Sequence, residues 1–454
     1  MEPTATSIPI PLATAETGGK HWYSDLKPQH YRVLAASFLG WVFDGYESYV
    51  LVLVIPFVLK AMLTPGQMAN RAIYAGMTFS VTLLGWGIGG MAGGIMADYV
   101  GRKRMMMLSI LGYALFTGFT ALSTDIWMFC FLRFVTGFFM GSEWSTGVAL
   151  LSETWPNKAR PKGAGFLQSG FGFGTLLAAL VWLVLSKTQP LGANTWRLVF
   201  VVGAMPALFC LYIRRAVGES EKWLKAIREQ RWATKKTDGS GGLNKRPFTL
   251  KEIFSEPVSR KNVLLAFLLS ITTTVGWYAI SIWLPDFAVQ MAKGLGQANP
   301  MVWGLRSALV YTTGAVVAYL VSGFAADALG RRPYLFVTFL GSLLTTAVVY
   351  LGTRSMEGLM VASFINGFFT LGCAYSWMAI YPVELFTSGV RSTAASFIFN
   401  GARLIAFVFP FLSGTIVRTF GSIPRAAMIM SSVYLIGLVV PWFLPETKGK
   451  PLPE

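Results

Sequence analysis

Five charged residues interrupt the apolar segments of this sequence: Asp44, Glu47, Arg133, Glu143 and Arg403. A charge at the centre of a bilayer costs at least about 2.5 to 3.5 kcal/mol on insertion scales, so each one needs a partner or a purpose. A carboxylate can carry a proton because burial disfavours its charged form and a nearby arginine favours it. Both histidines, His21 and His30, precede the first apolar segment, so the carboxylates are the candidate proton carriers.

Two of these carboxylates lie on one face of the first apolar helix. Asp44 lies about eleven residues into that helix, or roughly 16 Å along its axis, which is close to the bilayer midplane. Glu47 follows three residues later on the same face. Two carboxylates so placed should not both ionise easily, so we predict a protonation site here. The alternative is a hydrogen bond or ion pair between helices with no part in turnover.

The fourth apolar segment contains Arg133 and Glu143. They are ten residues apart, or about 15 Å along a helix, so they cannot pair within it. We predict that Glu143 is a second proton carrier and that Arg133 is either a coupling residue or a structural one. Helix packing is the alternative for Glu143.

Arg403 follows Arg391 by twelve residues, which places it near the midplane of the eleventh segment. A guanidinium can bind a carboxylate through two parallel hydrogen bonds, so we predict contact with an anionic ligand. An ion pair to another helix is the alternative. Rings with donor groups suit an organic acid with a flat or hydroxylated body, although such side chains also serve packing. The further candidates are Asn400, Trp277, Tyr278, Tyr375, Trp377, Gln168 and Asn366.

The segments that position these residues are membrane helices. The chain has 454 residues, of which 54% are hydrophobic and 13% charged, against about 25% charged in soluble domains. Runs such as 33–59 and 263–284 reach the roughly 20 apolar residues that a helix needs to cross about 30 Å of hydrocarbon. We count twelve such runs, which predicts an all-α membrane protein with both termini on one side.

Charge distribution predicts which side that is. The formal net charge is +17, and residues 214–261 alone hold 13 Lys and Arg against 6 acids. Basic loops stay in the cytoplasm, so both termini are predicted to be cytoplasmic and nucleic-acid binding is not expected. Residues 1–30 lack an apolar core typical of signal peptides. The three cysteines are scattered through apolar segments, so no metal or disulfide is predicted.

The sequence repeats itself at about half its length. The segment from Gly94 to Lys103 recurs from Gly323 to Arg332, a shift of 229 residues, and Glu153 with Arg160 recurs as Glu384 with Arg391, a shift of 231. The chain is therefore predicted to form two six-helix halves. Their boundaries are a cytoplasmic tail at 1–30, a first half at 31–216, a basic cytoplasmic linker at 217–261, a second half at 262–444 and a cytoplasmic tail at 445–454.

The repeated loops combine glycines, which let helices approach closely, with carboxylates that can meet a helix N-terminus. We expect contacts between helices that break and re-form as the halves rock, although these residues could serve topology alone. The predicted gating residues are Gly94, Asp98, Gly101, Arg102, Glu153, Arg160, Gly323, Asp327, Gly330, Arg331, Glu384 and Arg391.

These loops, the run from Arg133 to Gly141 and the ending from Leu444 to Gly449 resemble the major facilitator superfamily over residues 30–450. The resemblance implies twelve transmembrane helices in two pseudo-symmetric six-helix bundles. It also implies transport by alternating access to a site near the midplane. In that superfamily an arginine such as Arg133 is often tied to a carboxylate of another helix.

Two further segments narrow the resemblance. Residues 141–170 are similar to proton symporters for sialate and related organic acids, and the run from Asp44 to Glu47 resembles an Asp-Gly-x-Asp element of aromatic-acid proton symporters, with Glu as its last residue. This implies uptake of a small organic anion, such as sialate, a monocarboxylate or an aromatic or hydroxy acid, together with protons. A neutral sugar or polyol as the substrate, or a sensor that transports nothing, remains the alternative.

No enzymatic activity is predicted, because the apolar segments contain no metal cluster and no nucleophile and base constellation. The sequence has no nucleotide-binding loop, so ATP is not the expected energy source. The expected partners are a small organic acid, the proton and the lipid bilayer, with no cofactor. We expect a monomer in the plasma membrane, or the inner membrane of a bacterium.

Overall fold

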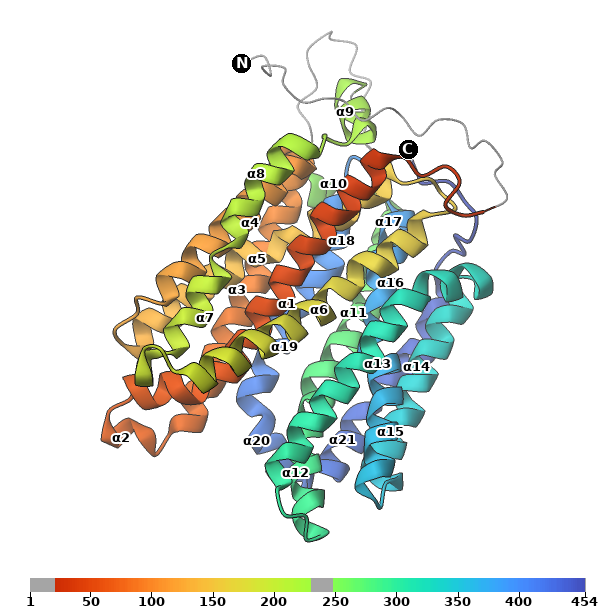
Figure 1. The fold of residues 1–454 in the computed structure, drawn as a ribbon. Coiled ribbons are helices and arrows are strands. Elements are labelled where there is room, and N and C mark those ends of the chain that lie inside the picture. The colour runs from red at the N-terminus through yellow and green to blue at the C-terminus, as the bar shows by residue number, and fades with distance from the viewer. Residues whose placement is uncertain (1–20, 230–247, 454) are drawn as a thin grey trace.

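The computed structural model describes residues 21–229 and 248–453, and this part of the chain is helical throughout (Figure 1). Eleven helical segments are long and apolar enough to span a membrane. The twelfth, α4 (Arg102–Thr120), has 19 residues and begins with three basic ones. The predicted all-α fold is therefore confirmed. Most of the predicted N-terminal tail and much of the predicted linker lie outside the described residues.

The first half contains six spanning segments. They are α1 (Pro28–Met62), α3 (Arg71–Val100), α4, α5 (Ile126–Thr154), α6 (Arg160–Thr188) and the pair α7 (Trp196–Gly203) and α8 (Pro206–Ala216), with the short α2 (Pro65–Met68) in a loop. Two short helices, α9 (Glu221–Arg228) and α10 (Thr249–Ser255), lie between the halves in the sequence.

The second half also contains six, several of them interrupted. They are α11 (Pro257–Ala279) with α12 (Leu284–Gly294); α13 (Pro300–Leu329); α14 (Arg331–Ala347); α15 (Met356–Gly367) with α16 (Ala374–Ile380) and α17 (Pro382–Leu385); α18 (Arg391–Gly401) with α19 (Arg403–Ala406) and α20 (Val408–Phe420); and α21 (Ile423–Ser431) with α22 (Tyr434–Val439).

Matching glycine contacts relate the two halves. A Cβ on Gly137 would lie 2.2 Å from a carbonyl oxygen of α3, and one on Gly367 would lie 2.0 Å from a carbonyl oxygen of α13. These glycines are 230 residues apart, whereas Glu153 and Glu384 are 231 apart. The π-helical turn Phe368–Cys373 lies between these positions in the second half. Its wider i to i+5 bonding accommodates the additional residue.

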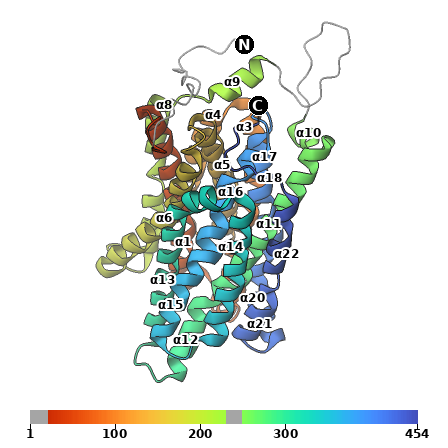
Figure 2. The same cartoon turned by 90° about the vertical axis from the view of Figure 1, so that its right-hand side faces the viewer.

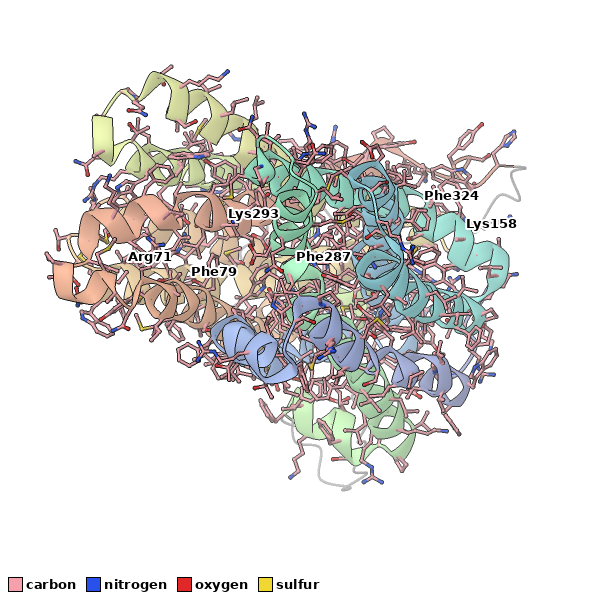
Figure 3. All side chains as sticks on the ribbon, turned by 90° about the horizontal axis from the view of Figure 1, so that it is seen from below. Arg71, Phe79, Lys158, Phe287, Lys293 and Phe324 are labelled. Atoms are coloured by element: carbon pink, nitrogen blue, oxygen red, sulfur yellow. The ribbon has the colours of Figure 1, made fainter. Side chains whose placement is uncertain are left out.

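Both ends of the described chain lie at one end of the bundle, which we call the terminal end, since Trp22 packs on Phe166 and Phe324 and Pro453 accepts a hydrogen bond from Arg391. Figure 1 shows the helices of the two halves close together there and diverging toward the opposite end. In Figure 2, α9 and α10 also lie at the terminal end, beside the C-terminus. Viewed from the opposite end, Arg71 and Phe79 mark the first half and Phe287 and Lys293 the second (Figure 3).

Small residues allow the two halves to approach each other. A Cβ on Gly94 of α3 would lie 2.2 Å from Ser396 Cβ of α18, and one on Gly323 of α13 would lie 2.2 Å from the carbonyl oxygen of Pro161 in α6. Any larger side chain at either glycine would push the halves apart, because both helix crossings are already in contact. The predicted close approach at these glycines is therefore present.

Candidate functional site

A cluster of aromatic rings lies between the two halves at mid-depth. The Trp41 ring centroid lies 6.3 Å from that of Trp86 and 6.0 Å from that of Phe399, and Trp144 stacks on Phe399 at 3.6 Å. Tyr375 extends the cluster into the second half, 6.4 Å from Phe399. Helices α1, α3, α5, α16 and α18 thus meet in one apolar surface, which we call the midplane cluster.

Most of this cluster was not predicted from the sequence. Trp41, Trp86, Trp144 and Phe399 were not predicted, whereas Tyr375 was. A usable signal was present for three of the rings, because Trp41 precedes Asp44 by three residues, Trp144 adjoins Glu143 and Phe399 precedes Arg403 by four. These three rings therefore lie within about one helical turn of a predicted charge, whereas Trp86 has no such neighbour in the sequence.

Arg403 lies against these rings. Its guanidinium carbon is 4.7 Å from the Trp86 ring centroid and 3.8 Å from that of Phe399, and Nη1 donates a hydrogen bond to the Phe399 carbonyl at 2.6 Å. The residue is 4% exposed. Within the described residues no carboxylate lies at ion-pair distance from it, and its Nε has no hydrogen-bond partner. The alternative of an ion pair to another helix is therefore not found in this part of the chain.

Asp44 and Glu143 form a pair of buried carboxylates. Neither is exposed to solvent, and none of their four oxygens accepts a hydrogen bond from a described residue. Gly40, one turn before Asp44, leaves room for Glu143, whose Oε1 would lie 2.0 Å from a Cβ there. Asp44 interacts electrostatically with Glu143 and Arg403. The structure thus brings together three charges that the sequence placed on three separate helices.

The other two midplane charges pair with each other. Arg133 Nη2 donates to Glu47 Oε1 and forms an ion pair between α5 and α1. The Arg133 guanidinium also lies 5.2 Å from the ring centroid of Phe200. Arg133 is thus tied to a carboxylate of another helix, as the family resemblance implied. Glu47 shares a helix face with Asp44 but has a different partner.

Two predicted polar side chains join the halves. Gln168 Oε1 accepts from Trp144 Nε1 at 2.6 Å, and its amide donates to the Tyr375 carbonyl at 3.3 Å. Asn400 Nδ2 donates to the Gly141 carbonyl of the first half at 3.1 Å. These amides therefore connect helices around the midplane cluster, and Asn400 Oδ1 has no partner among the described residues.

The remaining predicted candidates lie in the second half. Trp377 Nε1 donates to Thr273 at 3.2 Å, which joins α16 to α11. Asn366 donates to two threonines of α14, the shorter bond being 3.0 Å, so its amide joins α15 to α14. Trp277 packs edge-to-face on Tyr278 at 4.5 Å and lies 6.5 Å from Tyr375. Trp277 and Tyr278 thus adjoin the cluster, whereas the polar groups of Asn366 and Trp377 are used in packing.

At the terminal end, the predicted gating charges of the first half form one buried network. Arg102 pairs with Asp98 at 3.0 Å and with Glu153 at 3.1 Å. Glu153 also binds Arg391 of the second half at 2.9 Å. Asp98 Oδ2 accepts two hydrogen bonds from Thr393, one from its backbone N–H and one from its hydroxyl. That backbone N–H lies in the first turn of α18. The predicted meeting of Asp98 with a helix N-terminus is present.

The second half repeats this arrangement. Arg331 pairs with Asp327 at 2.8 Å and with Glu384 at 2.8 Å, and Glu384 also binds Arg160 of the first half at 3.4 Å. Asp327 pairs across the halves with Lys162. Each half's glutamate therefore binds its own arginine and one from the other half. We call these ion pairs the terminal network.

Two glutamates that were not predicted complete the network. Glu219 accepts the backbone N–H of the first residue of α4 at 3.0 Å, and Glu446 accepts that of the first residue of α14 at 2.9 Å. Thr447 Oγ1 donates to Glu384 at 2.5 Å. Glu219-Ser220 and Glu446-Thr447 are 227 residues apart, so the sequence repeat already contained the signal.

The two glutamates differ in proton affinity. Burial raises the pKa of Glu219 above its ordinary value, although backbone N–H groups and Arg102 oppose that shift. Burial also raises the pKa of Glu446, but hydrogen bonds from four backbone N–H groups lower it by more. The pKa of Glu446 therefore lies below its ordinary value. Hydrogen bonds to the charged form outweigh the cost of partial burial only at Glu446.

The C-terminal segment crosses the junction between the halves. The Pro453 carbonyl oxygen accepts a hydrogen bond from Arg391 Nη2 at 2.9 Å, and the Lys450 carbonyl oxygen accepts one from Arg160 Nη2 at 3.5 Å. Leu452 is 5% exposed. Because Arg160 and Arg391 belong to different halves, this segment contacts both sides of the terminal network.

Comparison with known proteins identifies the family. A model of the sugar (and other) transporter family matches residues 33–454. The chain belongs to that family. A protein of Haemophilus influenzae named for metabolite transport is 30% identical over 428 residues, 93% of this chain and 98% of that protein. The cis,cis-muconate transport protein of Acinetobacter baylyi is 27% identical over 420 residues, 91% of this chain and 94% of that protein.

A solved structure supports the same fold. The proton:xylose symporter XylE of the major facilitator superfamily, bound to 6-bromo-6-deoxy-D-glucose, superposes with a TM-score of 0.76 at 18% sequence identity. The match covers 93% of this chain and 98% of that one. The predicted major facilitator fold is confirmed, and this family member is a multi-pass membrane transporter.

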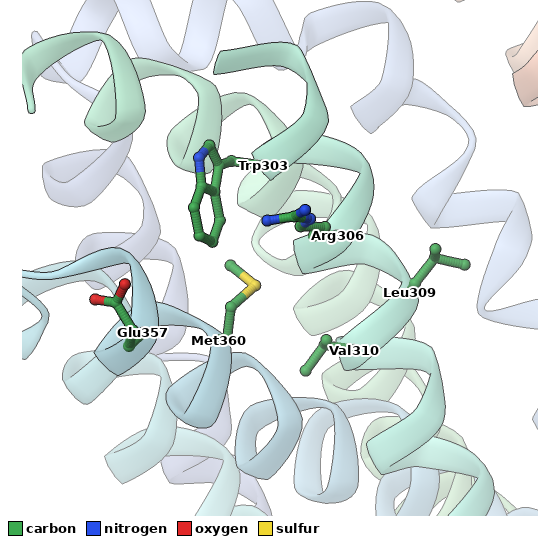
Figure 4. Close-up of a pocket in the computed structure, with 6 residues that line it drawn as sticks. All are labelled: Trp303, Arg306, Leu309, Val310, Glu357 and Met360. Atoms are coloured by element: carbon green, nitrogen blue, oxygen red, sulfur yellow. The ribbon is translucent and has the colours of Figure 1, made fainter. Parts of the chain in front are cut away.

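One open pocket of this transporter lies away from the midplane cluster. It has a volume of about 490 Å³ and lies between α13 and α15 (Figure 4), where it is lined by Trp303, Arg306, Leu309, Val310, Glu357 and Met360. None of the five charges predicted within the apolar segments lines it. Its residues come from the first eleven residues of α13 and the first five of α15, so we place the candidate site at the midplane cluster and not here.

Proposed function

We propose that this transporter imports a small organic anion together with one or more protons by alternating access. The observation that carries the proposal is the midplane cluster. There, the Arg403 guanidinium has no carboxylate at ion-pair distance among the described residues but interacts with Asp44, and neither Asp44 nor the neighbouring Glu143 accepts a hydrogen bond from a described residue. Such an arrangement leaves one positive group for an anion and two groups for protons.

Arg403 supplies the anion site in this proposal. A carboxylate can accept parallel hydrogen bonds from the guanidinium, and the rings of Trp86 and Phe399 offer flat surfaces beside it. The buried indole N–H groups of Trp41 and Trp86 lack partners among the described residues and can donate to further ligand oxygens. The relative named for cis,cis-muconate transport supports an organic acid as the substrate class.

Asp44 and Glu143 supply the proton site. Burying both in ionised form is costly because their charges repel and burial disfavours each charged form. Protonation removes that cost, and an anion at Arg403 removes the remaining positive charge. Closure around substrate and proton together is therefore favoured over closure around either alone. This coupling gives symport.

The terminal network supplies the gate. Its ion pairs across the two halves hold the terminal end closed, so transport requires that they break while the opposite end closes. The abundance of basic loops supports the cytoplasm as the side that the terminal end faces, with both termini there. We place the protein as a monomer in the plasma membrane, or in a bacterial inner membrane.

Proteoliposomes that contain a trapped pH dye test this function. Addition of cis,cis-muconate, benzoate or sialate should acidify the lumen for at least one acid, and Asp44→Asn should abolish the signal. The alternative substrate is a neutral sugar, which the family's breadth supports. Sugar counterflow that survives in Asp44→Asn, with no proton signal for any acid, would contradict the organic-anion proposal.

A further inference from the structure

One buried tyrosine beside the proton site has no role so far. Tyr113 of α4 is 0% exposed, and its hydroxyl has no hydrogen-bond partner among the described residues. It lies level with Asp44, because a Cβ on Gly147 of α5 would lie 3.2 Å from Ser37 of α1 and 3.4 Å from Met106 of α4, and Asp44 and Tyr113 each follow seven residues further along those helices. A buried hydroxyl without a partner costs free energy, so its presence calls for a partner in another state.

The groups around Tyr113 are mostly acidic. It interacts electrostatically with Asp44 and Glu47 of α1, with Glu143 of α5, and with Cys210 of α8. Glu47 already holds Arg133, and the Cys210 thiol donates to a backbone carbonyl at 3.5 Å. Asp44 and Glu143 are the two that lack a donor.

The phenol fits the need of those two carboxylates. Ionisation of either one inside the bundle requires a hydrogen-bond donor, because an unpaired charge is costly in a buried, low-dielectric environment. A phenol hydroxyl rotates about its C–O bond, so one group can donate to either of two neighbouring acceptors. Arg403 cannot serve both purposes, because it is needed for the anion in the proposed function.

We propose that Tyr113 is a positioning residue for proton release. Its hydroxyl donates a hydrogen bond to whichever of Asp44 and Glu143 has lost its proton. The phenol keeps its own proton, and the transported proton leaves from the carboxylic acid. This inference rests on the proposed proton symport and adds the group that makes the ionised carboxylate tolerable in the transport cycle.

Tyr113→Phe tests this role, with Tyr434→Phe as the matched control. Tyr434 of α22 is also 0% exposed and its hydroxyl also lacks a partner among the described residues, but its electrostatic neighbours are other tyrosines. Two rates are measured for each protein in proteoliposomes across a pH series. They are uptake driven by a proton gradient and counterflow without one.

In Tyr113→Phe the ionised carboxylate loses its donor, so the protonated form persists to higher pH. The pH of half-maximal driven uptake should rise by about one unit, while counterflow at acidic pH stays within about twofold of wild type. Tyr434→Phe should leave the profile in place. This combination supports the inference.

Three results would overturn it. Equal profiles in Tyr113→Phe and Tyr434→Phe, with pH-dependent wild-type uptake, would remove the role of Tyr113 and leave the proposed symport standing. Loss of counterflow at every pH in Tyr113→Phe would show a packing role instead. Wild-type uptake that is independent of the proton gradient would remove the proposed symport and this inference together.

Discussion

The two halves of the molecule are alike at the terminal end and unlike at the midplane. Each half builds the terminal network from an aspartate, an arginine and a glutamate at matching positions. Deeper in the membrane the first half contributes Asp44, Glu47, Arg133 and Glu143, whereas among the described residues the second contributes only Arg403. The fold is the same in both halves, so the proposed function accounts for the difference. In that proposal the gate needs the same contacts in both halves, whereas the proton and the anion need groups of opposite charge.

The largest expected effect concerns Arg403, the midplane charge of the second half. Arg403→Gln should reduce organic-anion uptake and counterflow by about a hundredfold, because the anion then lies buried without a counter-charge. Arg403→Lys should recover part of the loss. Radiolabelled substrate counterflow measures both. The exposed Arg306→Gln serves as the control, and equal activity of Arg403→Gln and this control would contradict the division between the halves.

The carboxylates of the first half should separate driven uptake from counterflow. Asp44→Asn and Glu143→Gln each mimic a protonated acid, so counterflow should stay within about threefold of wild type while accumulation driven by a pH gradient falls at least about tenfold. Parallel measurement of both rates checks this. Proton-driven accumulation retained in both variants would place the proton site elsewhere, with Glu47 as the next candidate.

The two terminal aspartates sharpen the comparison, because their surroundings differ. Asp98 is fully buried and bound by Thr393, whereas the Asp327 side chain is 25% exposed and pairs with Lys162. Asp98→Asn should shift the equilibrium between closed and open conformations of the terminal end toward the open one by about tenfold. Asp327→Asn should shift it by no more than about threefold, since exposed ion pairs contribute less to stability. Accessibility of single cysteines placed at each end of the bundle measures the shift. A larger effect of Asp327→Asn would reverse this ranking.

A smaller effect is expected from the C-terminal segment. Deletion from Lys450 onward removes two carbonyl acceptors and the buried Leu452, so the terminal end should open more often, by about threefold in cysteine labelling. Deletion of residue 454 alone is the control. Equal labelling rates in the two deletion variants would show that the segment does not stabilise the closed terminal end.

The smallest effect concerns the two glutamates that cap α4 and α14. The pKa of Glu446 is lowered, so its stabilisation is present above the ordinary value of 4.5 and is lost as the pH falls below it. The pKa of Glu219 is raised from the same value, so its ionisation weakens folding as the pH rises. At neutral pH, Glu446→Gln should therefore lower the melting temperature by a few degrees, whereas Glu219→Gln should leave it unchanged or raise it. Thermal unfolding in detergent from pH 4 to pH 7 tests the contrast.

Local sequence properties determined the twelve segments and the twofold repeat. Hydropathy and chain length decide whether a helix can span a bilayer, and both can be read within about twenty residues. The repeated glycines were predicted to allow close helix approach, and two of them also have a backbone role that was not predicted. Gly101 and Gly330 end α3 and α13 with φ angles of 107° and 96°, which side chains with a Cβ rarely adopt.

The partners of the charges were decided only by the tertiary structure. Asp44 and Glu47 lie three residues apart, yet Glu47 pairs with Arg133 while Asp44 adjoins Glu143 and Arg403. The sequence fixes the depth of each charge along its helix, because the rise per residue is constant. It does not fix the rotation of that helix against its neighbours, which depends on packing across the whole bundle. That rotation placed two unpredicted rings, Trp86 and Phe399, against Arg403 and left it without a carboxylate partner among the described residues.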